Sequence, residues 1–160
     1  MKLSTKGRYA VMAMVDLAHF SGGKPVALAD IAARQGISLS YLEQLFAKLR
    51  KSGLVRSVRG PGGGYLLAAA ASETRIADII LAVDEPIKAV RCKPGTSAGC
   101  LQDKSRCLTH DLWEELGNQI YLYLSSVSLA DVCERRVLGR SGELFCRDHE
   151  TSTQPIAAAE

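Results

Sequence analysis

Hydrophobic side chains recur with helical spacing along the first part of the chain. Residues 5–20 show the i, i+3, i+4, i+7 pattern of a helix with one buried face, and the two glycines and the proline at residues 22–25 predict its end. A second pattern covers residues 28–35 and stops at Gly36, a residue suited to the left-handed conformation after a helix. The predicted buried positions are Ala10, Val11, Met14, Leu17, Ala18, Leu28, Ile31 and Ala32.

A third helix is predicted directly after this turn. Ser40 and Glu43 have capping-box spacing and place its start near Ser40. Two short helices joined by a tight glycine-containing turn are typical of a helix-turn-helix, whose second helix enters the major groove of DNA. An ordinary amphipathic helix pair is the alternative. The apolar inner positions are Leu42, Leu45, Phe46 and Leu49, and the polar and basic outer positions are Tyr41, Gln44, Lys48 and Lys51.

The glycine-rich stretch RGPGGGY at residues 59–65 separates two short apolar segments that predict strands, at residues 54–58 and 65–67. Its glycines fit neither the P-loop pattern nor the dinucleotide pattern. Gly60 and Gly62 allow the backbone to approach a DNA groove, and Arg59 suits a phosphate or a narrow minor groove. A structural hairpin is the alternative, but the neighbouring basic helix favours a wing. We therefore predict a mainly α fold with a small β-hairpin wing, a winged helix-turn-helix.

The second half of the chain predicts two further helices. The first covers residues 72–84, with Ile76, Ile79, Ile80 and Val83 buried. From Leu108 onward, apolar residues recur every four positions up to Leu124, and Trp113, Tyr123 and Val127 widen the stripe. A stripe this wide predicts a long dimerisation helix, because a monomer would expose it to water. A homodimer would pair two recognition helices on an inverted-repeat operator, whereas burial within one chain is the alternative.

Charge is distributed unevenly between the two halves. Residues 1–65 hold 10 Lys and Arg against 3 Asp and Glu, whereas residues 66–160 hold 10 against 14. This asymmetry favours double-stranded DNA as the partner of the N-terminal half. The first 20 residues lack a signal-peptide cleavage site, and no stretch is long and apolar enough for a membrane span, so we expect a cytoplasmic protein without membrane contact.

Three cysteines and a histidine lie within 19 residues, in a segment rich in glycine, serine and threonine. Cys92, Cys100, Cys107 and His110 form a complete four-ligand set for zinc or an iron-sulfur cluster. The segment lacks C-x-x-C pairs, which disfavours a zinc ribbon, and unligated cysteines are the plainer alternative. Cys133, Cys146, His19 and His149 have no comparable partners nearby. We find no catalytic constellation, and expect neither an enzyme nor a small-molecule substrate.

These segments define three predicted regions. Residues 1–67 form the winged DNA-binding domain, residues 68–135 form the cluster-binding loop and the dimerisation helix, and residues 136–160 form a flexible tail. The segments LSTKGRYAVMAM, ISLSYLEQLFAKLRKSGLV and SVRGPGGGYLL, followed by three cysteines and CLTH, resemble the IscR family of iron-sulfur cluster regulators. The resemblance covers about residues 1–130 and implies a dimeric winged-helix repressor and activator with a [2Fe-2S] cluster.

The resemblance also implies roles for individual residues. Cys92, Cys100, Cys107 and His110 become the cluster ligands, although their first two gaps are longer than in the family. Glu43 becomes a selector, because a carboxylate accepts from cytosine but repels groups that offer only acceptors. Cluster binding would relieve that penalty. The implied DNA contacts are Ser38, Ser40, Tyr41, Glu43 and Gln44 at base edges and Arg59 in the minor groove; Lys48, Gly60 and Gly62 complete the predicted interface.

Three other functions are compatible with the same features. A regulator of the same fold would respond to redox state or nitric oxide instead of cluster supply. A small iron-sulfur electron carrier would use its basic half only to dock an acidic partner, and would bind DNA without sequence preference. A zinc-stabilised structural module would hold a different metal on the same four side chains.

Overall fold

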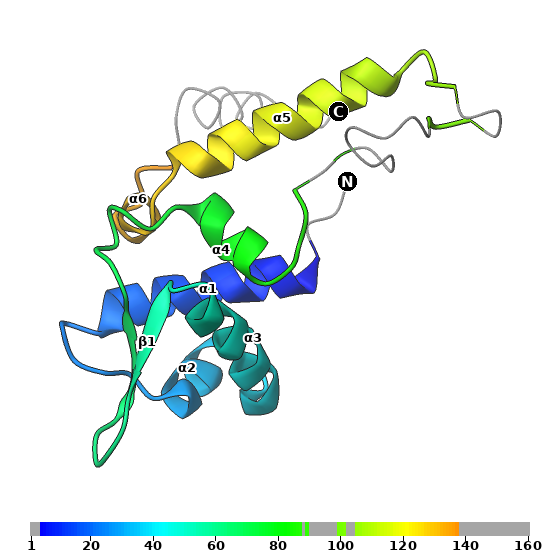
Figure 1. Ribbon diagram of the computed structural model, residues 1–160. Coiled ribbons are helices and arrows are strands. Elements are labelled where there is room, and N and C mark those ends of the chain that lie inside the picture. Colours follow the sequence, from blue (N-terminus) through cyan, green and yellow to red (C-terminus); the bar gives the residue numbers. More distant parts are fainter. Residues whose placement is uncertain (1–3, 88, 90–98, 102–104, 138–160) are drawn as a thin grey trace, which may run out of the picture.

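The computed structural model describes residues 4–87, 89, 99–101 and 105–137 (Figure 1). Six helices and one two-stranded antiparallel sheet make up this part of the chain. The elements in chain order are α1 (Thr5–Phe20), α2 (Leu28–Gln35), α3 (Leu39–Lys51), β1 (Val55–Val58), β2 (Gly64–Leu67), α4 (Ile76–Ala82), α5 (His110–Ser126) and α6 (Leu129–Cys133). The mainly α fold with a hairpin wing is therefore confirmed.

The three N-terminal helices pack around the apolar faces that the sequence predicted. The side chain of Ser4 accepts a hydrogen bond from the Lys6 N–H and starts α1. Gly36 ends α2 in the left-handed conformation at φ 64°, and its N–H donates to Ala32 O. The third helix buries Leu42, Leu45, Phe46 and Leu49, as expected. These side chains share one core with Ala10, Met14, Leu17 and Ile31.

The start of α3 differs from the prediction. Ser38, in an extended conformation, is its N-cap residue, and no side chain caps the helix. The Ser38 carbonyl accepts from the N–H groups of Tyr41 and Leu42, both at 3.1 Å, so Ser40 already lies inside the first turn. The predicted Ser40–Glu43 capping box is therefore wrong. Ser40 and Glu43 both lie on the exposed surface of the helix.

The wing is attached to the helical core at its base. In β1 and β2, Val55 pairs with Leu67 and Val58 with Gly64. Tyr65 exchanges two backbone hydrogen bonds with Val26, at 2.8 and 3.0 Å, and its ring meets that of Phe46 at a centroid distance of 4.9 Å. The loop of the hairpin extends away from the body of the molecule (Figure 1).

The second half adds three helices to the same core. Helix α4 is shorter than the predicted segment, because residues 71–73 form a turn and Arg75 is the N-cap residue, but Ile76, Ile79, Ile80 and Val83 are buried as expected. Helix α5 begins at His110 and lies across α4, and α6 returns to α1 (Figure 1). The core thus continues past residue 67. The three predicted regions stay predictions, and most of the predicted tail (136–160) lies outside the described residues, which end at residue 137.

A buried ion pair joins α1 to α2. The side chain of Asp16 is 0% exposed and accepts from Arg34 Nη2 at 2.7 Å, from Arg34 Nε at 3.0 Å and from Gln35 Nε2 at 2.8 Å. The guanidinium also lies 4.4 Å from the ring centroid of Phe20. This contact joins the last residues of α2 to α1, just before the turn that leads into α3.

The variant Arg34→Met is expected to lower the free energy of unfolding by about 3 kcal/mol, because it leaves the Asp16 carboxylate buried without its cation. Thermal and urea unfolding measure the change. Arg50→Met, which removes an exposed arginine from α3, is the matched control. Equal stability of the two variants would show that the buried pair does not hold the helices together.

Candidate DNA interface and metal-ligand loop

The predicted DNA contacts on the recognition helix all lie at the surface of the molecule. Ser38, Ser40, Glu43 and Gln44 are exposed, whereas Tyr41 and Lys48 are half-buried at the edge of the helix. The opposite face of α3 is packed into the core, so the helix presents one polar face outward. Ser38 precedes the first turn, where the side chains at the start of a recognition helix meet base edges. The structure therefore brings these six residues onto one accessible surface.

Two of these residues have partners within the chain. The ring of Tyr41 packs edge-on against Tyr9 of α1 at a centroid distance of 6.1 Å. The Lys48 ammonium lies 2.6 Å from a carboxylate oxygen of Asp84, and this hydrogen bond raises the pKa of Lys48. Asp84 follows α4, and the sequence pattern gave no sign of its contact with the recognition helix.

The wing residues are exposed and their glycines have a clear backbone role. Arg59, Gly60 and Gly62 all lie at the surface of the hairpin. Gly60 and Gly62 have φ values of 108° and 73°, which L residues rarely adopt, and the N–H of Gly63 closes the turn on Gly60 O at 2.9 Å. Turn geometry therefore accounts for these two glycines on its own, and Arg59 carries the argument for a DNA-binding wing.

The structure brings two of the predicted metal ligands together. Cys100 Sγ lies 3.0 Å from His110 Nδ1, within hydrogen-bonding distance. His110 is the first residue of α5 and is 5% exposed, and its N–H donates to the carbonyl of Cys107 at 3.0 Å. Cys107 Sγ lies 3.6 Å from Thr109 Oγ1 on the same turn. Cys92 lies outside the described residues.

These donors fit an iron-sulfur cluster or zinc. Sulfur and imidazole nitrogen are the ligands that both prefer, whereas magnesium and calcium prefer oxygen. The Cys100 thiol and the His110 ring nitrogen already face each other. Cys107 lies on the turn before α5, but its thiol does not form a three-ligand group with them among the described residues. The donor chemistry of the described residues is therefore compatible with the four-ligand set, but does not choose between the two metals.

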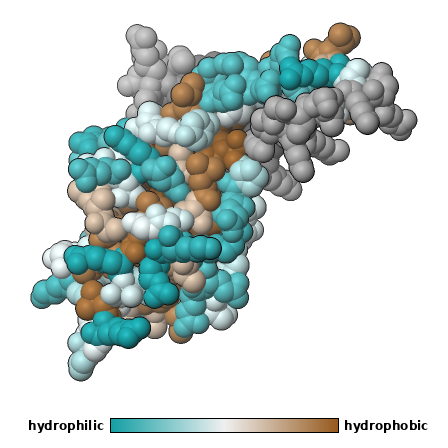
Figure 2. Space-filling view, in the orientation of Figure 1, coloured by the Kyte–Doolittle hydropathy of each residue, from teal (hydrophilic) through white to brown (hydrophobic). Residues whose placement is uncertain are grey.

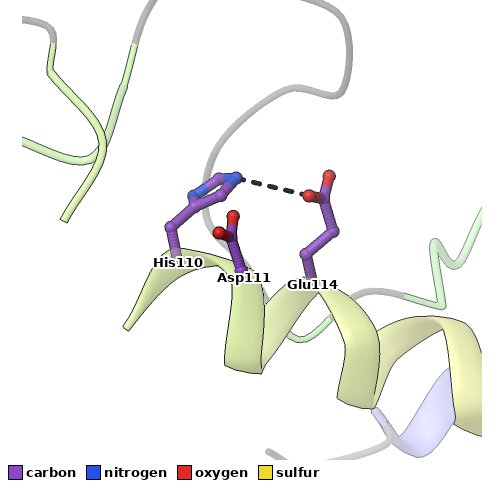
Figure 3. A group of neighbouring side chains, drawn as sticks. All are labelled: His110, Asp111 and Glu114. Carbon is purple, nitrogen blue, oxygen red and sulfur yellow. Dashed lines mark ion pairs between the residues drawn. The ribbon is translucent and has the colours of Figure 1, made fainter. Parts of the chain in front are cut away.

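A second group of possible ligands surrounds the same histidine. One ligand atom from each of His110, Asp111 and Glu114 lies within 4.8 Å of the other two (Figure 3). Glu114 Oε2 lies 3.6 Å from His110 Nε2, on the ring nitrogen that does not face Cys100. A carboxylate beside the second nitrogen is the usual outer partner of a metal-bound histidine. Sequence reasoning missed this pair, although the i, i+4 spacing of a histidine and a glutamate on a helix indicates it.

The apolar stripe of α5 is largely exposed in the single chain. Leu112 is 62% exposed, Trp113 44% and Tyr123 55%. Gly117 and His110 are the only fully buried residues of this helix, and Ile120 and Leu124 of the stripe are half-buried. The side of α5 turned to the viewer in Figure 2 is mainly hydrophilic. Helix α5 therefore has a polar side in addition to the apolar residues of the stripe. One end of the stripe packs against the core through Leu124 and Val127, whereas Leu112 and Leu116 stay exposed, so burial within one chain accounts for only part of the stripe among the described residues.

Comparison with known proteins agrees with the winged fold and with a role in transcription regulation. Residues 3–135 match the family model Rrf2, described as iron-dependent transcriptional regulator. A protein of Photorhabdus laumondii named HTH-type transcriptional regulator IscR is 53% identical over 161 residues, which cover 100% of this chain and 94% of that protein. The protein of the same name from Serratia proteamaculans is 57% identical over 132 residues, covering 82% and 79%.

Two solved structures resemble the model. That of T. potens IscR has a TM-score of 0.65 at 37% identity, and covers 97% of this chain and 94% of its own. That of CymR (YrzC), the global cysteine regulator of B. subtilis, has a TM-score of 0.71 at 33% identity, and covers 84% and 98%. No helix among the described residues is long and apolar enough to cross a membrane. The chain therefore belongs to the Rrf2 family of iron-dependent, DNA-binding transcriptional regulators, which are not enzymes.

Proposed function

We propose that this regulator is a homodimer that carries a [2Fe-2S] cluster on Cys92, Cys100, Cys107 and His110, and that cluster occupancy decides which operators it binds. The observation that supports the proposal most directly is the 3.0 Å approach of Cys100 Sγ to His110 Nδ1 beside the Cys107 turn. Genes for cluster assembly are the targets that the family resemblance implies. When clusters are plentiful, the loaded dimer would repress them.

The four side chains determine how tightly the cluster would be held. A cluster bound there would make the occupancy of the site a measure of how many clusters the cell supplies. Cysteine binds as the thiolate, whereas neutral imidazole is a weaker ligand that a proton can displace. One histidine among three thiolates therefore makes the site more labile than four thiolates would. Glu114, 3.6 Å from the second ring nitrogen, is placed to orient the imidazole when Nδ1 is the ligating atom.

The recognition helix would distinguish two classes of operator through Glu43. Gln44 has the amide group that pairs bidentately with adenine, and Ser38 and Ser40 can donate to or accept from base edges. Glu43 only accepts, so it favours cytosine and disfavours sites that present acceptors at its position. Its carboxylate is exposed on α3 and has no partner among the hydrogen bonds and ion pairs of the described residues. The loss of affinity at a mismatched site would therefore come from the contact of Glu43 with DNA alone.

The variant Glu43→Ala is expected to raise the affinity of the cluster-free protein for the rejected operator class by about 10-fold to 100-fold, since one mismatched contact costs about 1–3 kcal/mol. Fluorescence anisotropy at fixed salt, on duplexes of both classes, measures the change. Glu73→Ala removes the same charge from an exposed turn outside the interface and is the control. A uniform increase on both duplexes, or the same increase for the control, would mean that charge alone explains the effect.

The similarity to CymR supports one alternative, a regulator of the same fold that responds to redox state. One related structure is the oxidised form of S. aureus CymR, at 34% identity and a TM-score of 0.66. In that case the oxidation state or integrity of the site is the signal, and not its occupancy. Reversible oxidation that changes DNA affinity without loss of iron would favour this alternative.

Purification without oxygen tests the cofactor itself. Iron, acid-labile sulfide and zinc are measured per chain together with the visible spectrum. The proposal predicts two irons and two sulfides per chain and visible absorption bands. A colourless protein with one zinc per chain would instead support the structural zinc module.

A further inference from the structure

The residue that follows the C-cap of α4 has a left-handed backbone conformation. Asp84 has φ 57°, a left-handed value that only Arg135 shares among the non-glycine residues described. Such conformations are unfavourable for residues with a Cβ and persist where surrounding contacts hold them. Asp84 is 74% exposed, so burial does not hold it. The C-terminal turn of α4 holds it, because the N–H groups of Asp84 and Glu85 donate to Leu81 O at 3.0 Å and to Ile80 O at 3.4 Å.

The carboxylate of Asp84 lies among basic groups of α1 and α3. Its Oδ2 is 2.6 Å from Lys48 Nζ, and this hydrogen bond is the main reason why the pKa of Asp84 is lowered. The pKa of Lys6 is also lowered, first by its contact with Lys48 and also by the positive charge of that residue. Lys48 therefore lies near both a carboxylate, that of Asp84, and a second ammonium, that of Lys6.

The next residue fixes this junction to α1. Glu85 accepts hydrogen bonds from Ser4 N, Ser4 Oγ and Gly7 N, each at 2.6 Å. A Cβ at Gly7 would lie 2.6 Å from a Glu85 carboxylate oxygen, so a larger residue there would have to displace the end of that side chain. An acidic side chain at a helix N-terminus is favourable in itself, since it meets unpaired N–H groups and the positive end of the dipole. Glu85 thus anchors the backbone from which Asp84 reaches Lys48.

Lys48 belongs to the helix that we propose enters the major groove, and its side chain is 39% exposed. A lysine at the edge of such a helix gains affinity by neutralising a DNA phosphate. In this structure an internal carboxylate already neutralises it. We propose that Asp84 determines the DNA affinity of this protein as an internal competitor, occupying Lys48 in place of a DNA phosphate. This inference rests on the proposed DNA-binding role of α3.

The test uses Asp84→Asn in the full-length, cluster-free protein, so that its outcome does not depend on the cluster. Wild-type and variant are titrated onto an inverted-repeat operator duplex and a scrambled duplex between about 50 and 200 mM KCl. The variant is expected to bind both duplexes about 5-fold to 10-fold more tightly at the lowest salt. The slope of log affinity against log salt should steepen by about 0.9 for each Lys48 released, about 2 for a dimer.

Two further variants separate local competition from general charge. Asp78→Asn removes an exposed carboxylate from α4 and should change affinity by less than half as much. Combining Asp84→Asn with Lys48→Met should abolish the gain, because no released ammonium remains. Thermal unfolding checks that each variant is folded.

Two results would overturn the inference. The first is a folded Asp84→Asn protein that binds both duplexes with the affinity of wild-type, or with no more than the affinity of Asp78→Asn. That result would contradict the competition, although the wild-type would still prefer the operator. A wild-type protein without operator preference would instead overturn the proposed function, and this inference with it.

Discussion

Leu116→Asp on α5 is expected to convert the protein to a monomer at micromolar concentration and to lower its affinity for an inverted-repeat operator by about 100-fold. Leu116 is 40% exposed in the single chain and lies between Leu112 and Ile120 in the apolar stripe. In a two-fold dimer each substituted carboxylate meets apolar surface of the partner, where an unpaired charge is costly. Binding of one subunit to its half-site then no longer favours binding of the second subunit. In a dimer this coupling raises the affinity for DNA by about 100-fold or more.

The measurement is sedimentation velocity together with operator titration. Asn118→Asp places the same charge on an exposed position of the same helix outside the stripe, and is expected to leave both the dimer and the DNA affinity unchanged. If Leu116→Asp stayed dimeric with normal operator affinity, the stripe would not be the dimer interface. The pairing of two recognition helices through α5 would then have to be abandoned.

Cys100→Ser is expected to reduce the iron content and the visible absorption of anaerobically purified protein to about one tenth of wild-type or less. A serine oxygen is a hard donor, whereas iron-sulfur clusters require the soft thiolate that it replaces. Cys100 is the thiol that the structure places 3.0 Å from His110 Nδ1, so its loss removes one side of the proposed site. Iron and sulfide analysis with the visible spectrum measures the effect.

Cys133→Ser is the matched control for this experiment. Burial raises the pKa of the Cys133 thiol, whose Sγ lies 3.8 Å from the carbonyl oxygen of Val15, and it contacts no predicted ligand. We expect its iron content to equal that of wild-type. His110→Cys should retain the cluster and lose it more slowly to a chelator, because a fourth thiolate replaces the weaker imidazole. Equal iron contents for Cys100→Ser and Cys133→Ser would contradict the ligand set.

The helices of the DNA-binding region were predictable because their buried faces repeat along the chain. The predicted inner positions of α3, Leu42, Leu45, Phe46 and Leu49, are all buried in the structure, and Gly36 ends α2 as its backbone freedom suggests. Helix α6 was not predictable in this way. It has five residues, too few for a repeat, and is stabilised by a capping box between Ser128 and Asp131 and by burial of Leu129. The sequence feature that indicates this helix is the capping pair Ser128 and Asp131, not a repeat of apolar residues.

The site was predictable in composition but not in geometry. Three cysteines and a histidine in one segment indicated metal binding, but not that Cys100 would face His110 Nδ1 or that Glu114 would lie on the other ring nitrogen. The Ser40–Glu43 box failed for a related reason. Spacing shows which residues can form a capping box, whereas the length of the preceding turn decides where the helix begins. The contact of Lys48 with Asp84 joins residues 36 positions apart, so no local pattern indicates it.

The central claim is that cluster occupancy selects the operator. It is tested most directly by titrating one anaerobic preparation, first loaded and then cleared of iron by a chelator, onto duplexes of the two operator classes at the same salt concentration. The account predicts that the cluster-free protein loses about 10-fold or more of its affinity for the class that Glu43 disfavours, and binds the other class unchanged. Identical affinities of the loaded and cluster-free forms for both duplexes would contradict it.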